Sequence, residues 1–172
     1  MLLEFDTLKG LDPARFMEIY REGNEENADY FYPNAGDKAQ AIAKVEADFL
    51  DYLRRDFFTR DGSRYLILEE NGLWVSALRL YFVEEGLWYL EALETRPDCR
   101  RQGYGAKLLT EALEYLKQKG PFRLCDCVSK RNVASLKTHE KCGFSVATDP
   151  GYDYLQKTAD EGHVGMEYRW EG

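Results

Sequence analysis

The segment from Arg100 to Gly105 contains residue types that bind an anion at the start of a helix. Arg100 and Arg101 supply positive charge, and Gly103 and Gly105 leave the backbone uncovered by a Cβ. The first N–H groups of a helix lack intrahelical partners and lie at the positive end of its dipole, which favours phosphate. The spacing is too short for the dinucleotide fingerprint G-x-G-x-x-G, and no P-loop motif is present. The remaining pattern, R-x-x-G-x-G, predicts either an anion site or an ordinary tight turn.

A second segment, from Ser129 to Phe144, predicts a short helix with polar residues along one side. Asn132 stands where its side chain can cap the first turn, and His139 lies two turns further along the same face. The sequence here reads N-x-x-S followed by H-E-K-x-G-F. Together with R-x-x-G-x-G, it resembles the two motifs of the GNAT superfamily of acyl-CoA-dependent N-acetyltransferases. His139 occupies a position that is usually tyrosine in that family.

The resemblance implies acetyl-CoA as the cofactor and assigns its contacts residue by residue. The turn would hold the diphosphate of coenzyme A, the end of the preceding strand would lie beside the acetyl group and pantetheine, and the second motif would line the cofactor arm. The residues are Arg100, Arg101, Gln102, Gly103, Tyr104, Gly105 and Ala106 in the turn, Leu93, Glu94 and Thr95 in the strand, and Asn132 and His139 in the second motif. The alternative for the arginines is simple pairing with the acidic strand beside them.

Acyl transfer to an amine requires a proton acceptor, because a lysine-like amine has a pKa of about 10 and is protonated at neutral pH. Glu91 is the predicted acceptor, since it interrupts an apolar strand where a charge needs a partner or a function. Glu94, Glu69 and Glu70 are competing candidates. The alternative is that Glu91 faces solvent or pairs with a basic residue of a neighbouring strand, such as Arg79.

His139 is the second candidate catalytic residue, because the family's tyrosine at this position is commonly assigned as the general acid toward the leaving thiolate. An imidazole with a pKa near 6.5 donates a proton more readily than a phenol with a pKa near 10. Two alternatives stay open. A thiol with a pKa of about 8.5 can leave as the anion without an acid, or His139 only forms hydrogen bonds within the packing of its helix.

The elements that position these residues follow from hydrophobic periodicity. Apolar residues at three- and four-residue spacing predict four helices. The first starts at Pro13 behind the cap Asp12, and the others cover 38–58, the stretch from the glycine turn to Gly120, and 132–142. Apolar and aromatic runs predict a short edge strand in 1–6 and strands over 64–69, 73–83, 87–95, 122–128, 144–147 and 164–170. Residues 23–37 predict a polar, aromatic-bearing loop, and residues 149–162 a loop or short helix. This order indicates an α/β fold with α+β layers, in which helices flank a mixed, mostly antiparallel sheet similar to that of the GNAT family.

Length and charge restrict the classes of function. The 172 residues, 44% of them hydrophobic, fit one domain over residues 1–172. A formal net charge of −8 argues against nucleic acid or an anionic membrane as a partner. The N-terminal segment lacks a signal-peptide pattern, and four cysteines without paired C-x-x-C spacing, with two histidines, argue against a metal site. We therefore expect a reduced cytoplasmic protein.

The resulting hypothesis is an acetyl-CoA-dependent N-acetyltransferase that acts directly on a primary amine of a small molecule or peptide. Its acceptor pocket is expected between the aromatic and acidic region 20–32 and the tyrosine-bearing region 152–161, although the same aromatic residues could form the seam of a homodimer. The alternative is a non-catalytic acyl-CoA-binding or partner-binding module on the same fold. A nucleotide-binding protein is a weaker alternative, because a P-loop lysine and a third glycine are both absent.

Overall fold

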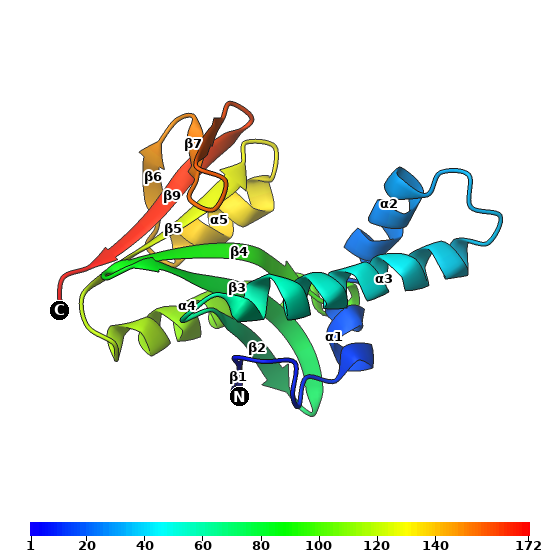
Figure 1. Cartoon of the computed structure of the whole chain (residues 1–172). Helices are drawn as coiled ribbons and strands as arrows, with labels where there is room; N and C mark the ends of the chain where they lie inside the picture. The colour runs from blue at the N-terminus through cyan, green and yellow to red at the C-terminus, as the bar shows by residue number, and fades with distance from the viewer.

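The computed structural model covers residues 1–172 and is centred on a seven-stranded sheet (Figure 1). The strand order is β1-β2-β3-β4-β5-β9-β6, in which β4 and β5 are parallel and all other neighbours are antiparallel. The strands are β1 Leu2–Phe5, β2 Arg64–Glu70, β3 Leu73–Glu84, β4 Leu87–Thr95, β5 Phe122–Ser129, β6 Ser145–Thr148, β7 Gly151–Asp153, β8 Thr158–Asp160 and β9 His163–Trp170. The mixed, mostly antiparallel sheet predicted from the sequence is confirmed.

Helices cover both faces of this sheet. One face carries α1 (Pro13–Ile19) and α3 (Lys38–Arg55), with α2 (Arg21–Phe31) packed beside α3, and the other carries α4 (Tyr104–Lys117) and α5 (Val133–Lys141) (Figure 1). Short 3-10 turns, η1 (Phe57–Thr59) and η2 (Pro97–Cys99), follow α3 and β4. The α2–α3 connection projects beyond the sheet (Figure 1). None of the helices has the length and apolar character needed to cross a membrane.

Two cores result from the alternation of side chains along the strands. On β2, Leu66 and Leu68 join the core beneath α4, whereas Tyr65 and Ile67 join the core beneath α1 and α3. Strands that are buried on both faces read as continuous apolar runs, which is why the central strands could be predicted from the sequence. The α4 core receives Leu108, Leu109, Ala112, Leu113 and Leu116 from the predicted stripe of that helix.

The predicted helix caps are present. The Asp12 side chain accepts hydrogen bonds from the backbone N–H groups of Ala14 and Arg15 at 3.0 and 3.2 Å, and Pro13 follows at the first helical position. Asn132 accepts from the N–H of Ser135 at 3.0 Å and starts α5. Each cap satisfies an N–H that the helix itself leaves without a partner.

Two expected loops are regular structure instead. Most of region 23–37 belongs to α2, a polar helix that buries only Asn24 and Ala28 and packs against Ala41 and Val45 of α3. Region 149–162 forms the β7–β8 hairpin rather than a loop or short helix. Neither segment has an apolar periodicity from which its structure could be predicted. Tertiary contacts stabilise both segments instead.

The parallel strands β4 and β5 separate along their length. They pair only from Leu87 to Leu90, where Leu90 faces Asp126, and diverge beyond this point. Backbone groups on the β5 side of residues 91–95 therefore have no partner strand. This opening lies at the carboxyl end of both strands, next to the start of α4.

A bulge in β4 changes which way its acidic side chains point. Arg79 of β3 pairs with Glu91, and Ala77, two residues away, pairs with Glu94, so β4 holds one extra residue in this stretch. Ala92, within the bulge, has a positive φ of 53°. Because side chains alternate with a period of two, the extra residue puts Glu91 and Glu94 on the same face of the sheet.

Candidate functional site

Two cavities lie on either side of the bulged end of β4. The first, about 640 Å³, is bounded by Tyr20, α2, α3 and the strands β3 and β4, and the second, about 580 Å³, lies between the end of β4, the start of α4 and α5. Ala92 lines the first cavity and its neighbour Leu93 lines the second. The β4 backbone is therefore the wall that the two cavities share.

The second cavity contains all the residues predicted to bind the cofactor except Gln102 and His139. Its lining is Leu93, Glu94, Thr95, Arg100, Arg101, Gly103, Tyr104, Gly105, Ala106, Asn132, Ala134, Ser135, Lys137, Thr138 and Lys141. The sequence analysis missed the residues after Asn132, although positions 134, 137, 138 and 141 share one helix face at three- and four-residue spacing. Two sequence motifs thus meet around one space, as expected.

The glycine turn leaves the start of α4 open. Gly103 is the N-cap residue with φ of 81°, and no side chain caps the helix. A Cβ at Gly105 would lie 3.4 Å from Thr95 Oγ1, at the limit of ordinary van der Waals contact, so the start of α4 lies directly against β4. The uncapped first turn faces a cavity lined by basic side chains, which is the arrangement that a diphosphate requires.

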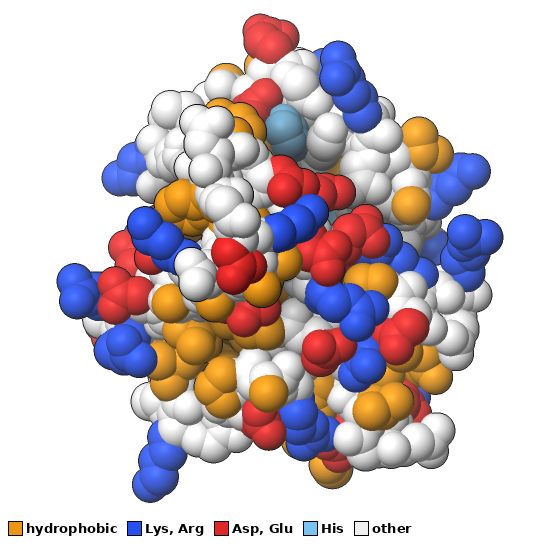
Figure 2. All heavy atoms as spheres, turned by 90° about the vertical axis from the view of Figure 1, so that its right-hand side faces the viewer, with side chains coloured by type: hydrophobic (Ala, Val, Ile, Leu, Met, Phe, Trp, Pro, Cys, Tyr) orange, Lys and Arg blue, Asp and Glu red, His pale blue; other side chains and the backbone are white.

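The basic residues of this cavity differ in their partners. Arg100 donates from Nη1 to Glu22 Oε2 at 2.8 Å and from Nη2 to Glu94 Oε1 at 3.3 Å. Arg101, Lys137 and Lys141 also line the cavity but form no ion pair within 4.0 Å. The expectation that an arginine pairs with the acidic strand therefore describes Arg100 and not Arg101. On the face at the α2–α3 end, acidic and basic side chains are intermixed (Figure 2).

His139 lies outside both cavities. Its side chain is 0% exposed, with Nε2 2.8 Å from Asp126 Oδ2 and Nδ1 2.8 Å from the backbone oxygen of Ser135. Both partners accept hydrogen bonds, so the ring can donate to both of them only in its protonated form. Burial lowers the pKa of His139, but the hydrogen bond and charge of Asp126, together with the hydrogen bond to Ser135 O, outweigh burial and hold the pKa above its usual value. A direct contact with the cofactor, as predicted, is not possible in this arrangement, and the alternative of hydrogen bonding within the packing describes the structure.

Glu91 is paired rather than free. Arg79 Nη2 donates to Glu91 Oε2 at 3.2 Å, and Glu91 lines neither cavity. Burial raises the pKa of Glu91, and Arg79 and a hydrogen bond from Tyr81 oppose this effect. The structure therefore shows the pairing alternative, and the role of Glu91 in proton transfer stays a prediction.

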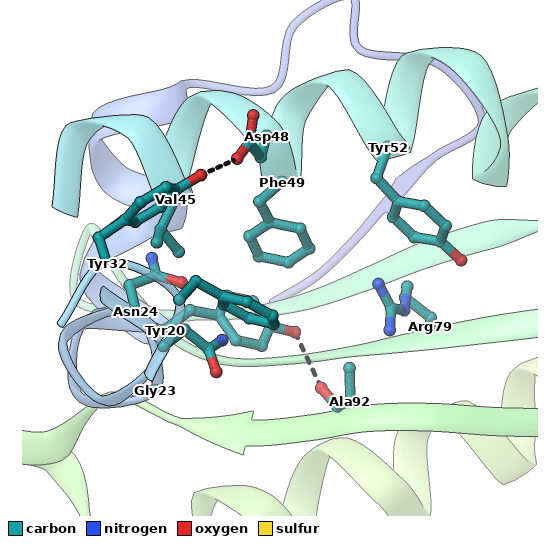
Figure 3. Close-up of a pocket in the computed structure, with 12 residues that line it drawn as sticks. Tyr20, Gly23, Asn24, Tyr32, Val45, Asp48, Phe49, Tyr52, Arg79 and Ala92 are labelled. Carbon is teal, nitrogen blue, oxygen red and sulfur yellow. Dashed lines mark hydrogen bonds between the residues drawn. The ribbon is translucent and has the colours of Figure 1, made fainter. Parts of the chain in front are cut away.

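Five of the twelve residues that line the first cavity are aromatic (Figure 3). Tyr20 OH donates to Ala92 O at 2.8 Å, and Tyr32 OH donates to Asp48 Oδ2 at 3.0 Å. Its lining is Tyr20, Gly23, Asn24, Asn27, Phe31, Tyr32, Val45, Asp48, Phe49, Tyr52, Arg79 and Ala92. Region 20–32 forms one side, as expected for an acceptor pocket. The opposite side is α3 and not region 152–161, because Tyr154 packs instead on Tyr89.

Comparison with known proteins identifies the family. Residues 19–144 match the acetyltransferase (GNAT) family. The chain belongs to the GNAT family. Over 97 residues it is 31% identical to the [ribosomal protein bS18]-alanine N-acetyltransferase of Escherichia coli strain K12, and this match spans 55% of the chain and 64% of the length of that relative.

Solved structures of other GNAT proteins share the fold of this chain. The PaiA N-acetyltransferase of Thermoplasma acidophilum, in complex with coenzyme A, has a TM-score of 0.63 at 17% identity and covers 99% of both chains. YncA, a putative acetyltransferase of Salmonella typhimurium with acetyl-CoA, has a TM-score of 0.59 at 19% identity, over 100% of this chain and 95% of that one. The ribosomal-protein-S18-alanine N-acetyltransferase of Escherichia coli has a TM-score of 0.61 at 20% identity, over 100% and 96%.

The cofactor predicted for this GNAT chain fits its second cavity. The uncapped α4 turn and the unpaired Arg101, Lys137 and Lys141 suit a diphosphate, and the open edge of β4 suits an extended amide-bearing arm. No group of three or more His, Cys, Asp or Glu side chains is placed to hold a metal ion.

Proposed function

We propose that this GNAT protein transfers an acetyl group from acetyl-CoA directly to a primary amine of a small molecule or peptide. The observation that carries the proposal is that the two cavities share the β4 wall at Ala92 and Leu93. An acceptor in one cavity and a cofactor in the other would approach each other where β4 and β5 separate. Proximity of this kind is a major part of bimolecular catalysis.

The chain's own groups would hold the cofactor in three places. Backbone N–H groups from Arg101 to Ala106 would bind the diphosphate, with Arg100 and Arg101 adding charge, and the α5 face behind Asn132 would line the arm. When bound, acetyl-CoA supplies an acetyl thioester with an electrophilic carbonyl carbon. N–H groups within residues 93–95, on the open side of β4, are the donors expected to polarise that carbonyl.

The first cavity suits a cationic acceptor. An alkylamine has a pKa of about 10 and enters as an ammonium, which aromatic faces and a carboxylate attract. Tyr20, Phe49 and Tyr52 supply rings, and Asp48 supplies a negative charge on the α3 side. Arg79 also lines this cavity, but its charge is paired with Glu91 at 3.2 Å. The similarity to a bS18-alanine N-acetyltransferase adds a peptide N-terminal alanine to the acceptors that should be tested.

Thermal unfolding tests the cofactor assignment. Acetyl-CoA at about 100 times its Kd should stabilise the protein by about 2.7 kcal/mol and raise Tm by about 5–10 °C. Gly103→Glu should abolish this shift, because it places a carboxylate at the uncapped turn. Gly72→Glu is the matched control, since Gly72 also has a positive φ, of 78°, a Cβ there also meets nothing within 4 Å, and the added charge is the same. The absence of any shift in the wild-type protein, or an equal shift in both variants, would contradict the proposal.

The buried position of His139 favours a second candidate, a non-catalytic module that binds acyl-CoA. His139 lines neither cavity, so the position that is usually tyrosine in the family supplies no general acid to either of them. Thiol release from acetyl-CoA across a panel of an alanine-initiated peptide, spermidine and phenylethylamine separates the candidates. A catalytic protein releases thiol with at least one acceptor, and a binding module releases none while still showing the thermal shift.

Two properties of the whole molecule complete the proposal. All four cysteines are free, which supports location in the reducing cytoplasm. Tyr30 and Phe31 are 78% and 63% exposed at the end of α2, which supports a homodimer through this projection. Sedimentation of the wild-type protein and of Tyr30→Ser tests the dimer, which the substitution should weaken.

A further inference from the structure

The proton acceptor for the proposed reaction can be sought among the carboxylates beside the shared β4 wall. Glu91 is held by Arg79 and lines neither cavity. Glu94 is the one carboxylate in the lining of the second cavity, and its side chain is 39% exposed. The β4 bulge turns Glu94 toward the same face as Glu91, which is the face that carries α1, α2 and α3. Glu94 therefore lines the second cavity and lies two residues after Ala92, which lines the first.

Arg100 links Glu94 to α2, because it donates hydrogen bonds to both Glu94 and Glu22. Burial raises the pKa of Tyr20, and the charge of Glu94 contributes to the same rise, so Glu94 acts on a residue that lines the acceptor cavity. Glu22 of α2 acts in turn on Glu94. Gly23 and Asn24, which follow Glu22, line the acceptor cavity.

Two donors hold the Glu94 carboxylate. Its Oε1 atom accepts from the backbone N–H of Thr95 at 3.1 Å and from Arg100 Nη2 at 3.3 Å. Arg100 also belongs to the turn expected to bind the diphosphate. The Glu94 carboxylate therefore occupies an arginine and an N–H in the cavity where the anionic cofactor would bind.

We propose that Glu94 is the carboxylate that accepts the proton of the acceptor amine, and that it becomes free to do so when Arg100 turns from Glu94 to the bound diphosphate. This inference rests on the proposed acetyltransferase function and names the base in its site. In the proton step, an N–H bond of the acceptor ammonium breaks and its electron pair stays on nitrogen. The proton forms an O–H bond with Glu94 and then passes to solvent.

The charges around Glu94 support this order of events. Burial raises the pKa of Glu94, whereas the Thr95 N–H and Arg100 lower it and Glu22 raises it. When Arg100 moves away, one of the effects that lower the pKa of Glu94 is lost, so the carboxylate becomes a stronger base as the cofactor binds. A general base is most effective when its pKa lies close to the working pH. Arg100 also donates from Nη1 to Glu22 of α2 at 2.8 Å, so the same arginine contacts the helix beside the acceptor cavity.

Calorimetry with coenzyme A tests the displacement without any acetyl transfer. Titrations at pH 5.5 in two buffers of different ionisation enthalpy measure the protons taken up on binding. The wild-type protein should take up more protons than Glu94→Gln, because binding raises the pKa of Glu94. Protons taken up by the phosphate of coenzyme A are the same for both proteins. Glu94→Gln should also bind coenzyme A about twofold to fivefold more tightly, since Arg100 is no longer shared. Equal proton uptake and equal affinity would overturn the displacement.

Steady-state kinetics with the most active amine of the panel test the base. Glu94→Gln should lower kcat by about 100-fold and remove the acidic limb of the pH profile, and Glu94→Asp should restore part of the activity. Glu114→Gln is the matched control, because it removes an ion pair with Lys117 at 2.7 Å on the outer face of α4. Full activity of Glu94→Gln, or loss only in Glu91→Gln, would overturn this inference while the proposed function stands. Wild-type protein that binds no coenzyme A and releases no thiol would instead overturn the proposed function.

Discussion

Replacing Asp126 with asparagine should reverse the way in which His139 makes stability depend on pH. The substitution keeps an oxygen that can accept the hydrogen bond from Nε2, but it removes the negative charge. In the wild-type protein, burial lowers the pKa of His139, but Asp126 and the Ser135 hydrogen bond together hold that pKa above its usual value of about 6.5. In Asp126→Asn, burial is left largely unopposed, so the pKa of His139 should fall below 6.5.

The sign and size of the effect follow from this shift. With a raised folded pKa, the wild-type contribution is fully present below the unfolded pKa of about 6.5 and is lost as pH rises through the folded pKa. With a lowered folded pKa, the contribution of His139 in Asp126→Asn increases as pH rises toward about 6.5. Removing one partner of a pair whose side chains are 0% and 12% exposed should cost about 3 kcal/mol below pH 6. One proton changes the free energy of unfolding by at most about 1.4 kcal/mol per pH unit.

Urea unfolding between pH 5.5 and 8.5, followed by tryptophan fluorescence, measures the difference between the two proteins. The wild-type advantage should be largest at pH 5.5 and should decrease as pH rises. Asp160→Asn is the matched control, because the His163–Asp160 pair, 2.9 Å apart, has side chains that are 35% and 50% exposed and should contribute less than about 1 kcal/mol. A wild-type advantage that stays constant with pH would show that His139 is not charged, and would refute the reasoning.

Two further substitutions test the packing around the sheet and the acceptor cavity. Gly165→Ala should lower the free energy of unfolding by about 1–3 kcal/mol, because its Cβ would overlap Thr148 Oγ1 of β6. Adding Thr148→Ala to the same chain should restore part of this loss, as measured by urea unfolding. Tyr20→Phe should raise KM for the acceptor without changing the Kd for coenzyme A, because it removes the hydrogen bond to Ala92 O on the acceptor side of β4. Tyr30→Phe is the control and should change neither value, because Tyr30 is 78% exposed.

The cofactor cavity could be predicted from the sequence because most of its lining is local. Residues 93–106 form the end of a strand, a turn and the first residues of a helix, so their neighbourhood follows from their order in the chain. Asn132 could also be predicted as part of this cavity, because a cap side chain identifies the start of a helix. Gln102 is the exception within the turn, since the chain direction there, with Arg101 at a positive φ of 61°, takes it out of the lining.

The position of His139 could not be predicted in the same way. Two turns of helix place it in line with Asn132, but the spacing does not say whether that side meets the cavity or the sheet. Asp126 carried a usable signal, because it alternates with Leu124 and Val128 on the face of β5 that packs beneath α4 and α5. A carboxylate in that pattern requires a partner, and a histidine on the covering helix is a suitable one.

The acceptor cavity depends on contacts that no single segment encodes. α2 is too polar for its apolar pattern to predict a helix, and it is placed by packing against α3. α3 then supplies Val45, Asp48, Phe49 and Tyr52 to the side of the cavity that was expected from region 152–161. The pairing of Glu91 with Arg79 was foreseen as an alternative because the two residues lie on neighbouring strands, and their register decided it.

The bulge in β4 follows from the burial preferences of the residues around it. Without the extra residue, Glu94 would alternate onto the face of Leu90, which is buried in the core beneath α4, and a charge there would lack a partner. With the bulge, Leu93 packs against that core and Glu94 turns to the opposite face. Ala92 tolerates the positive φ at the cost of about 1 kcal/mol, which is less than burying the carboxylate. The irregularity that keeps a charge out of the core therefore also places Glu94 in the lining of the second cavity, two residues from Ala92 of the first, and the assignment of Glu94 as the base depends on it.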